Sequence, residues 1–232
     1  MKYMGSKNRH AKELLPIILK DRKDGQWYVE PFVGGANMID KVDGNRIGSD
    51  LDEDLIYLWQ GVSNGWMPPV EFAEDKYKVI KNSEPSPLRG YTAFALSYGG
   101  KKFGGWRRDS AGNRNYVAEA YRNAEKQFPK LRDVNFYCLP YDKLNIPNDS
   151  IVYCDPPYQG TTKYRNDFDH DKFWQWVRET SKEHTVFVSE YNAPDDFECV
   201  WEKQVNSSLA KDTGSKKNIE KLFKFKEQTN DG

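Results

Sequence analysis

The sequence has few cysteines, few histidines and no long apolar run, and each shortage excludes a class of protein. Its three cysteines, Cys138, Cys154 and Cys199, are too few and too scattered for a disulfide framework. Its three histidines lie far apart, so we expect no metal site. A run of about 18 apolar residues, as a membrane span needs, is missing, as is a secretory signal. We therefore expect a cytoplasmic protein without a membrane partner.

The chain also lacks net charge, because 35 lysines and arginines balance 35 aspartates and glutamates among its 232 residues. The balance is uneven, however. Residues 76–132 hold 13 basic and four acidic residues, a net charge of +9, and the remainder therefore carries −9. Such a basic island is typical of a phosphate-binding surface. The zero total excludes a uniformly basic protein but not one that binds nucleic acid.

The pattern of apolar runs predicts an α/β protein. We expect strands at 27–33, 46–50, 134–138, 150–154 and 185–188, and helices at 52–61, 116–128 and around 173–177. Aromatic residues make up 14% of the chain, enough to build a core from few residues. Residues 61–115 are rich in glycine and proline, and we interpret them as irregular or loop-rich. The predicted organisation is a body of residues 1–60 and 130–232, with residues 61–129 inserted.

Two features near the amino terminus suggest a nucleoside site. The Gly34-Gly35 turn directly follows the first apolar strand, and glycine lets a backbone approach a ligand closely. Asp50 ends the next strand, where a carboxylate can accept both hydroxyls of a ribose. Each feature has a simpler interpretation, since a Gly-Gly pair is often only a turn and such an aspartate is commonly a helix cap.

The most informative stretch is Asp155-Pro156-Pro157-Tyr158, which follows the apolar strand at 150–154. Two prolines stiffen the backbone and remove two N–H donors. They leave a carboxylate, a carbonyl and an aromatic ring at the end of a strand. This set suits an exocyclic amino group, with Asp155 and the Pro156 carbonyl as acceptors and Tyr158 as a stacking face. A rigid turn with a packed tyrosine is the plain structural alternative.

Taken together, these elements resemble the S-adenosylmethionine-dependent DNA adenine-N6 methyltransferases of the Dam type, the D12 class, close to versions carried by phages. The likeness rests on residues 3–7 (Tyr-Met-Gly-Ser-Lys), residues 30–37, residues 48–50 and residues 155–158, in the motif order of the α group. It implies a Rossmann-like class I methyltransferase sheet with an inserted, mostly helical or loop target-recognition segment. It also implies S-adenosylmethionine as cofactor, double-stranded DNA as partner, and base flipping.

The same resemblance implies roles for individual residues. The target adenine would be held by Asp155, Pro156 and Tyr158. A late segment, residues 216–223, resembles the closing strand region of the family. The cofactor would be contacted by Tyr3, Lys7, Phe32, Gly34, Gly35, Asp50, Tyr141 and Asp155.

The basic island is densest at residues 101–108, where cations alternate with aromatics and glycines. Arginine can contact phosphates or guanine edges, and an aromatic ring can wedge into the gap that a flipped base leaves. An ordinary solvated loop is the alternative. The segment departs from the pattern of GATC-specific relatives at residues 113–117, so the recognition sequence does not follow. The expected DNA contacts are Lys101, Lys102, Trp106, Arg107, Arg108, Arg114 and Lys163.

Other activities remain open at this point. Methyltransferases acting on RNA, on cytosine N4 or on a protein glutamine share the tetrapeptide chemistry. A catalytically silent DNA-binding protein is a further alternative, which the intact Asp50 and Asp155 disfavour. A nicotinamide dehydrogenase is disfavoured because GxGxxG is absent. No obligate protein partner is indicated.

Overall fold

The computed structural model describes residues 1–109, 111–159, 168–206 and 217–226. Seven strands form one mixed sheet in the order β3-β2-β1-β4-β5-β7-β6, which confirms the predicted α/β class. The pairs β2–β3, β1–β4 and β4–β5 are parallel, whereas β7 pairs antiparallel with both β5 and β6. The strands are β1 (Tyr28–Glu30), β2 (Arg46–Ser49), β3 (Asn135–Tyr137), β4 (Ile151–Cys154), β5 (Thr185–Glu190), β6 (Phe197–Asn206) and β7 (Lys217–Phe225).

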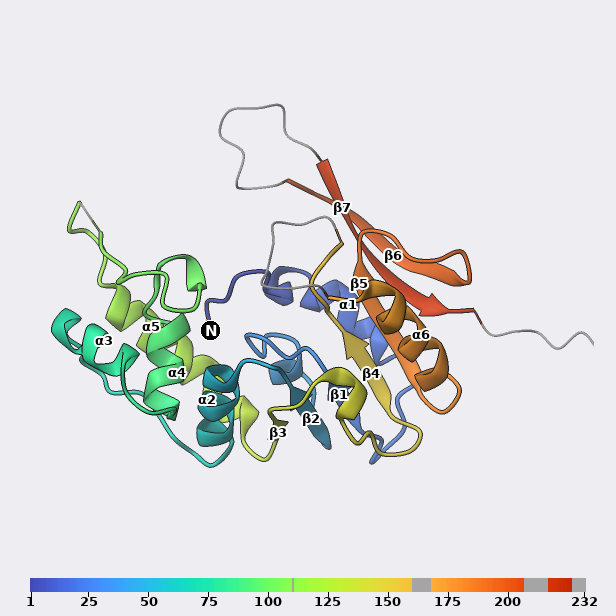
Figure 1. The fold of residues 1–232 in the computed structure, drawn as a ribbon, viewed down its shortest axis with the longest axis horizontal. Coiled ribbons are helices and arrows are strands. Elements are labelled where there is room, and N and C mark those ends of the chain that lie inside the picture. The colour runs from blue at the N-terminus through green and yellow to red at the C-terminus, as the bar shows by residue number, and fades with distance from the viewer. Residues whose placement is uncertain (110, 160–167, 207–216, 227–232) are drawn as a thin grey trace, which may run out of the picture. The chain divides into compact units, whose positions relative to one another are not determined.

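Helices and strands alternate irregularly along the chain, and the order can be followed by the colours of Figure 1. Within the described residues none is long and apolar enough to cross a membrane. Side-chain caps begin α2, α4, α5 and α6. The helices are α1 (Ala11–Ile18), α2 (Glu53–Ser63), α3 (Glu74–Lys81), α4 (Pro87–Phe94), α5 (Tyr116–Gln127) and α6 (His170–Thr180).

The chain divides into two compact units, each made of two segments. Unit 1 consists of Met1–Lys12 and Glu30–Asn145, and unit 2 of Glu13–Val29 and Ile146–Gly232. The segment expected as an insertion, 61–129, lies wholly inside unit 1 together with the Gly34-Gly35 turn. The division into a body and an inserted target-recognition segment stays a prediction.

Helix packing organises unit 1. Helix α4 approaches α2 so closely that a Cβ at Gly90 would lie 2.0 Å from the carbonyl oxygen of Asp54. Trp59 of α2 is fully buried and meets Phe128 edge to face, with ring centroids 5.9 Å apart. Tyr91 of α4 also contacts Phe128 edge to face. Aromatic side chains therefore supply much of this core, as the composition predicted.

In unit 2, strands β4 and β5 are buried along nearly their whole length, as expected for inner strands of a sheet. Helix α6 buries Phe173, Trp174 and Val177, and the Trp174 ring lies 4.7 Å from that of Phe197 on β6. Strand β6 carries a register shift between Cys199 and Trp201.

The predicted elements match the structure unevenly. Helices α2 and α5 and strands β2, β3, β4 and β5 lie where the apolar pattern placed them, and α6 extends the helix expected around 173–177. The first strand is shorter than 27–33, because Pro31 and the turn after it end the ladder. The interpretation of 61–115 as irregular is wrong for α3 and α4: Pro87 opens α4 at its first turn, behind a Ser86 cap. Helix α1 and strand β6 were not foreseen.

Candidate functional site

A strained turn follows β1 in unit 1. Gly34 has φ +45° and Ala36 has φ +52°, both in the left-handed region that disfavours side chains. The ring of Tyr3 lies over this turn, because a Cβ at Gly34 would come within 2.8 Å of Tyr3 Cε1. Gly35 is equally crowded, with Tyr3 Cβ at 2.6 Å from the position of such an atom. Three of the residues expected at the cofactor site are thus in direct contact.

Asp50, at the end of β2, binds the same turn. Its Oδ2 accepts the N–H of Gly34 at 3.0 Å, and its Oδ1 accepts the N–H of Asp52 at 3.0 Å. Burial raises the pKa of Asp50 above its usual value in spite of hydrogen bonds from the backbone N–H groups of Asp52, Gly34 and Leu51. A carboxylate can accept about four hydrogen bonds, so Asp50 retains acceptor capacity beyond these backbone bonds. The side chain is partly exposed, so the arrangement suits two neighbouring hydroxyl groups of a ligand.

Phe32 and Tyr141 form a second contact among the expected cofactor residues. Their rings stack at a centroid distance of 5.4 Å and an interplanar angle of 29°. Both side chains are partly exposed. Lys7 is buried in the short 3-10 turn Lys7–Arg9, whose start is capped by Ser6. Unit 1 therefore holds every expected cofactor residue except Asp155.

Exposed apolar side chains surround Asp50, and the sequence analysis did not single them out. Leu51 is 71% exposed, Tyr137 42% and Leu139 36%. The backbones of Tyr137 and Leu139 are tied together, since Ser49 Oγ donates to their carbonyls at 2.9 Å and 2.8 Å. The available signal was their position directly after the ends of two parallel strands, where ligands of open α/β sheets bind.

In unit 2, the tetrapeptide at 155–158 directly follows buried strand β4. Pro156 is buried, whereas Asp155 and Tyr158 are partly exposed. The Tyr158 hydroxyl donates to Glu220 Oε2 on β7 at 2.9 Å, and its ring meets that of Tyr191 edge to face at 4.7 Å. Burial, with the nearby negative charges of Asp155 and Glu220, raises the pKa of Tyr158 well above its usual value. Tyr158 is therefore a neutral, fixed aromatic surface.

Glu190 is a further residue that the sequence analysis missed. It ends β5 and is only 2% exposed. Its carboxylate accepts the N–H of Gln159 at 3.1 Å and the N–H of Tyr191 at 2.7 Å. Glu190 thus ties the backbone after Tyr158 to the end of the neighbouring strand.

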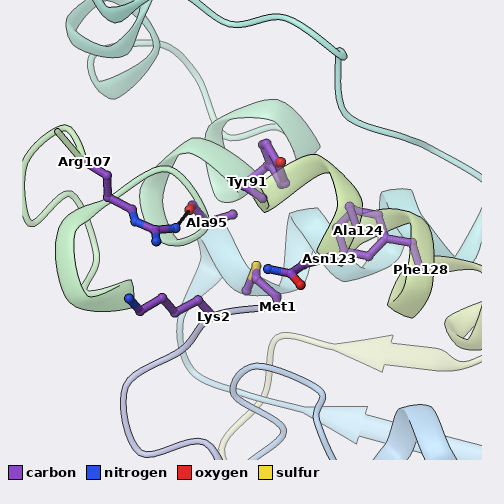
Figure 2. A pocket seen from close by; sticks show the side chains of 9 residues that line it. Met1, Lys2, Tyr91, Ala95, Arg107, Asn123, Ala124 and Phe128 are labelled. Atoms are coloured by element: carbon purple, nitrogen blue, oxygen red, sulfur yellow. Dashed lines mark hydrogen bonds between the residues drawn. The ribbon is translucent and has the colours of Figure 1, made fainter. Parts of the chain in front are cut away.

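Two of the residues expected to contact DNA, Lys102 and Arg107, form ion pairs with acidic side chains of unit 1. Lys102 Nζ lies 2.9 Å from both Asp52 and Asp54. Although burial lowers its pKa, these two carboxylates outweigh that effect and raise it. Arg107 is buried: it donates to the Ala95 carbonyl at 3.3 Å (Figure 2) and pairs with Glu119 at 3.2 Å. The geometry gives both cations structural roles and does not support direct DNA contact by Arg107.

The remaining basic and aromatic residues differ in exposure. Trp106 packs against Phe72 and Tyr77, so it is not a free wedge. Lys101 is exposed and makes no ion pair with the described residues. Arg108 is 70% exposed beside Glu74.

Arg114 is 59% exposed and pairs with Glu119 at 2.6 Å. Lys163 lies outside the described residues. In the described part of the chain, no group of three or more histidine, cysteine or acidic side chains could hold a metal ion.

Comparisons with known proteins point to the family that the sequence motifs resemble. Residues 3–92 match the family model for D12 class N6 adenine-specific DNA methyltransferases. The chain is 30% identical over 172 residues to the DNA adenine methylase of Escherichia coli K12, covering 62% of this chain and 60% of that protein. It is 29% identical over 176 residues to the DNA adenine methylase of Salmonella typhi, with the same shares.

The modification methylase StsI of Streptococcus sanguinis is 25% identical over 197 residues, or 72% of this chain and 29% of that protein. The chain thus spans about three fifths of the length of the adenine methylases that it resembles. These matches confirm the expected family resemblance.

Proposed function

We propose that this chain methylates the N6 amino group of adenine in double-stranded DNA, because residues 3–92 match the family model for D12 class N6 adenine-specific DNA methyltransferases. S-adenosylmethionine is the proposed methyl donor. Such an enzyme acts in the cytoplasm of a bacterial or phage-infected cell. The observation that carries the proposal is the tetrapeptide of residues 155–158, held at the end of β4 with its tyrosine fixed by Glu220.

The chemistry of the donor set in unit 1 fits this cofactor. Asp50 keeps acceptor capacity for a ribose diol beyond the backbone N–H groups that it binds. The apolar side chains of Leu51 and Leu139 suit the flat face of an adenine. Tyr3, Lys7, Phe32, Gly34, Gly35 and Tyr141 complete the proposed cofactor site. When bound, S-adenosylmethionine supplies an electrophilic methyl group on a sulfonium.

The residues of the tetrapeptide would prepare the nucleophile. The amino nitrogen of adenine is unreactive because its lone pair is delocalised into the ring. Asp155 and the Pro156 carbonyl would accept its two N–H groups, so that the nitrogen approaches sp³ geometry and its lone pair becomes available. Direct in-line transfer needs no covalent enzyme intermediate, and the protein contributes orientation and electrostatics.

A base inside a duplex is out of reach, so the target adenine must leave the stack. The Tyr158 ring would support it there. The exposed cations Lys101, Arg108 and Arg114 are the proposed backbone contacts, and Lys163 remains a proposed contact as well. The recognition sequence is left open because residues 113–117 depart from the GATC pattern.

The test is to incubate the protein with labelled S-adenosylmethionine and a duplex library, then map the label. We expect label on adenine N6 within a defined sequence, and its loss in Asp155→Ala. Asp171→Ala serves as the matched control, because Asp171 is an exposed acid on α6 of the same unit. Label on RNA or on cytosine, or near-normal turnover by a folded Asp155→Ala protein, would overturn the proposal.

A further inference from the structure

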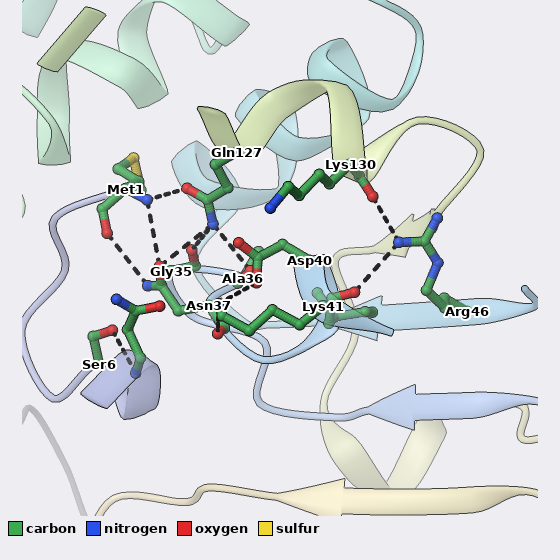
Figure 3. A network of polar contacts seen from close by, with 12 residues as sticks. Met1, Ser6, Gly35, Ala36, Asn37, Asp40, Lys41, Arg46, Gln127 and Lys130 are labelled. Carbon is green, nitrogen blue, oxygen red and sulfur yellow. Dashed lines mark hydrogen bonds and ion pairs between the residues drawn. The ribbon is translucent and has the colours of Figure 1, made fainter. Parts of the chain in front are cut away.

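The carbonyl side of the turn after β1 is held by two helices. Trp59 Nε1 of α2 donates to the Gly34 carbonyl at 2.8 Å. Gln127 Nε2 of α5 donates to the Gly35 and Ala36 carbonyls, each at 3.0 Å (Figure 3). Three successive carbonyls of one turn therefore each receive a side-chain N–H. Residues about 25 and 91 positions later in the chain supply these donors.

These hydrogen bonds lie in the protein interior. Trp59 is fully buried and Gln127 is only 4% exposed, so water does not replace a donor that is removed. The remaining amide oxygen of Gln127 accepts from the amino group of Met1, which also lies 3.4 Å from Asn37 Oδ1. Gln127 is thus the centre of a small polar network under the turn, as Figure 3 shows.

The turn needs such support because of its backbone. Ala36 is a non-glycine residue at φ +52°, a conformation that persists only where the surroundings enforce it. The opposite, amide side of the turn faces Asp50, which accepts the Gly34 N–H. The Gly35 carbonyl shares its peptide plane with the Ala36 N–H, and that N–H donates to the Val33 carbonyl at 2.8 Å. The Val33 carbonyl in turn shares its plane with the Gly34 N–H that binds the Asp50 carboxylate, so fixing the turn from the carbonyl side also orients this N–H.

We propose that Trp59 and Gln127 are positioning residues that hold the Gly34–Ala36 turn in its cofactor-binding shape. The inference rests on the proposed function, since it concerns the same cofactor site. Neither side chain has to touch the cofactor. Both act through the backbone that carries Gly34 and Gly35. Gln127 ends α5, which lies within the basic island of residues 76–132, so it joins this part of the chain to the cofactor turn.

The test compares Gln127→Met with Gln60→Met. Gln60 of α2 is exposed and donates one side-chain amide bond to the Phe136 carbonyl at 2.9 Å, so it controls for loss of a glutamine-to-carbonyl bond that does not involve the turn. For each protein we would measure the dissociation constant of S-adenosylmethionine by calorimetry, kcat with duplex DNA at saturating cofactor, and the midpoint of thermal unfolding. We expect Gln127→Met to weaken cofactor binding on the order of tenfold, with kcat changed by less than about twofold. Gln60→Met should bind the cofactor as the wild type does.

Trp59→Phe is the second variant, because it keeps a buried aromatic ring and removes the N–H, together with part of the ring volume. It decides the question if Gln127→Met does not fold. Unchanged cofactor affinity in folded variants, with lower unfolding midpoints alone, would overturn the positioning role and leave the proposed function intact. A wild-type protein that binds no S-adenosylmethionine would overturn the proposed function and this inference with it.

Discussion

The Tyr158 hydroxyl donates a 2.9 Å hydrogen bond to Glu220, so a residue on β7 fixes the ring that ends the proline-rich turn after β4. The ring would support a base that has left the duplex. The hydroxyl only orients that ring, and the two contributions can be separated by substitution.

Tyr158→Ala should lower single-turnover methyl transfer about 10- to 100-fold, because base–aromatic stacking contributes ~1–3 kcal/mol. Tyr158→Phe keeps the ring and loses one hydrogen bond, so we expect a loss of less than about tenfold. Rates are compared on one duplex at saturating cofactor. Equal losses in the two variants would mean that the hydroxyl, and not the ring, matters.

The pH dependence of cofactor binding should reflect Asp50. Burial raises its pKa, and the ionised form is the one that accepts two hydroxyls. As the pH falls through this raised pKa, Asp50 gains a proton, so affinity for S-adenosylmethionine should fall at a higher pH than the usual value of about 4 would give.

The Asp50→Asn variant should bind S-adenosylmethionine weakly, and its affinity should not depend on pH in this way.

The raised pKa of Asp50 also predicts an effect of opposite sense on the stability of the fold. Any stability that protonated Asp50 contributes is lost as the pH rises through its pKa in the folded state. Calorimetric titrations and chemical unfolding across about pH 4–7 would measure both effects. A wild-type affinity that is flat over this range contradicts the assignment of Asp50.

Alanine substitution of Lys101 should affect DNA binding, whereas alanine substitution of the adjacent Lys102 should affect the stability of the fold. Lys101→Ala should reduce the salt dependence of DNA binding by about one counterion, since an exposed lysine is available to phosphates. Lys102→Ala should change that slope little and instead destabilise the fold by about 1 kcal/mol, because it removes a partner of buried Asp54. Binding measured at several salt concentrations, with urea unfolding, separates the two. The reverse pattern would assign Lys102 to the DNA.

Alanine substitutions at Gly35 and Gly5 test whether the close contact between Tyr3 and the Gly34–Gly35 turn matters for cofactor binding. A Cβ at Gly35 would lie 2.5 Å from Asn37 Nδ2 and 2.6 Å from Tyr3 Cβ, so Gly35→Ala should displace both and raise the KM for the cofactor. Gly5 has φ +80° but open space around it, so Gly5→Ala adds strain of about 1 kcal/mol without a clash. Steady-state kinetics with unfolding measurements compares the two. A similar KM in both variants would remove Tyr3 from the cofactor site.

Sequence reasoning predicted several residues at strand ends that the structure brings into contact with one another. Asp50 and Gly34, predicted separately, are bound to each other, and Phe32 stacks on Tyr141. Such residues are recognisable because parallel strands bring their carboxyl ends to one edge of a sheet.

Residues that act on backbone carbonyls escaped detection. Gln127 and Trp59 occupy helices, where a glutamine resembles a surface residue and a tryptophan a core residue. Their partners, three carbonyls, have no side-chain signature. Glu190 was missed for the same reason, since it binds two backbone N–H groups.

Counting charges along the chain overstated the free basic surface. Two of the acids that neutralise it lie outside residues 76–132: Glu74 pairs with Arg108, and Asp54 with Lys102. Only folding reveals such pairs. The sequence predicts that residues 76–132 carry a net positive charge, but it does not reveal which of their cations are exposed and unpaired.

The register shift in β6 bears on how molecules of this protein behave toward one another. Among the described strands β6 is the last of the sheet, and a long outer strand offers unpaired backbone groups to any second chain. The irregular spacing between Cys199 and Trp201 interrupts that row. The exposed, oppositely charged Glu202 and Lys203 follow it directly. Together they oppose the edge-to-edge pairing that leads to aggregation, and so favour separate molecules when the protein is concentrated.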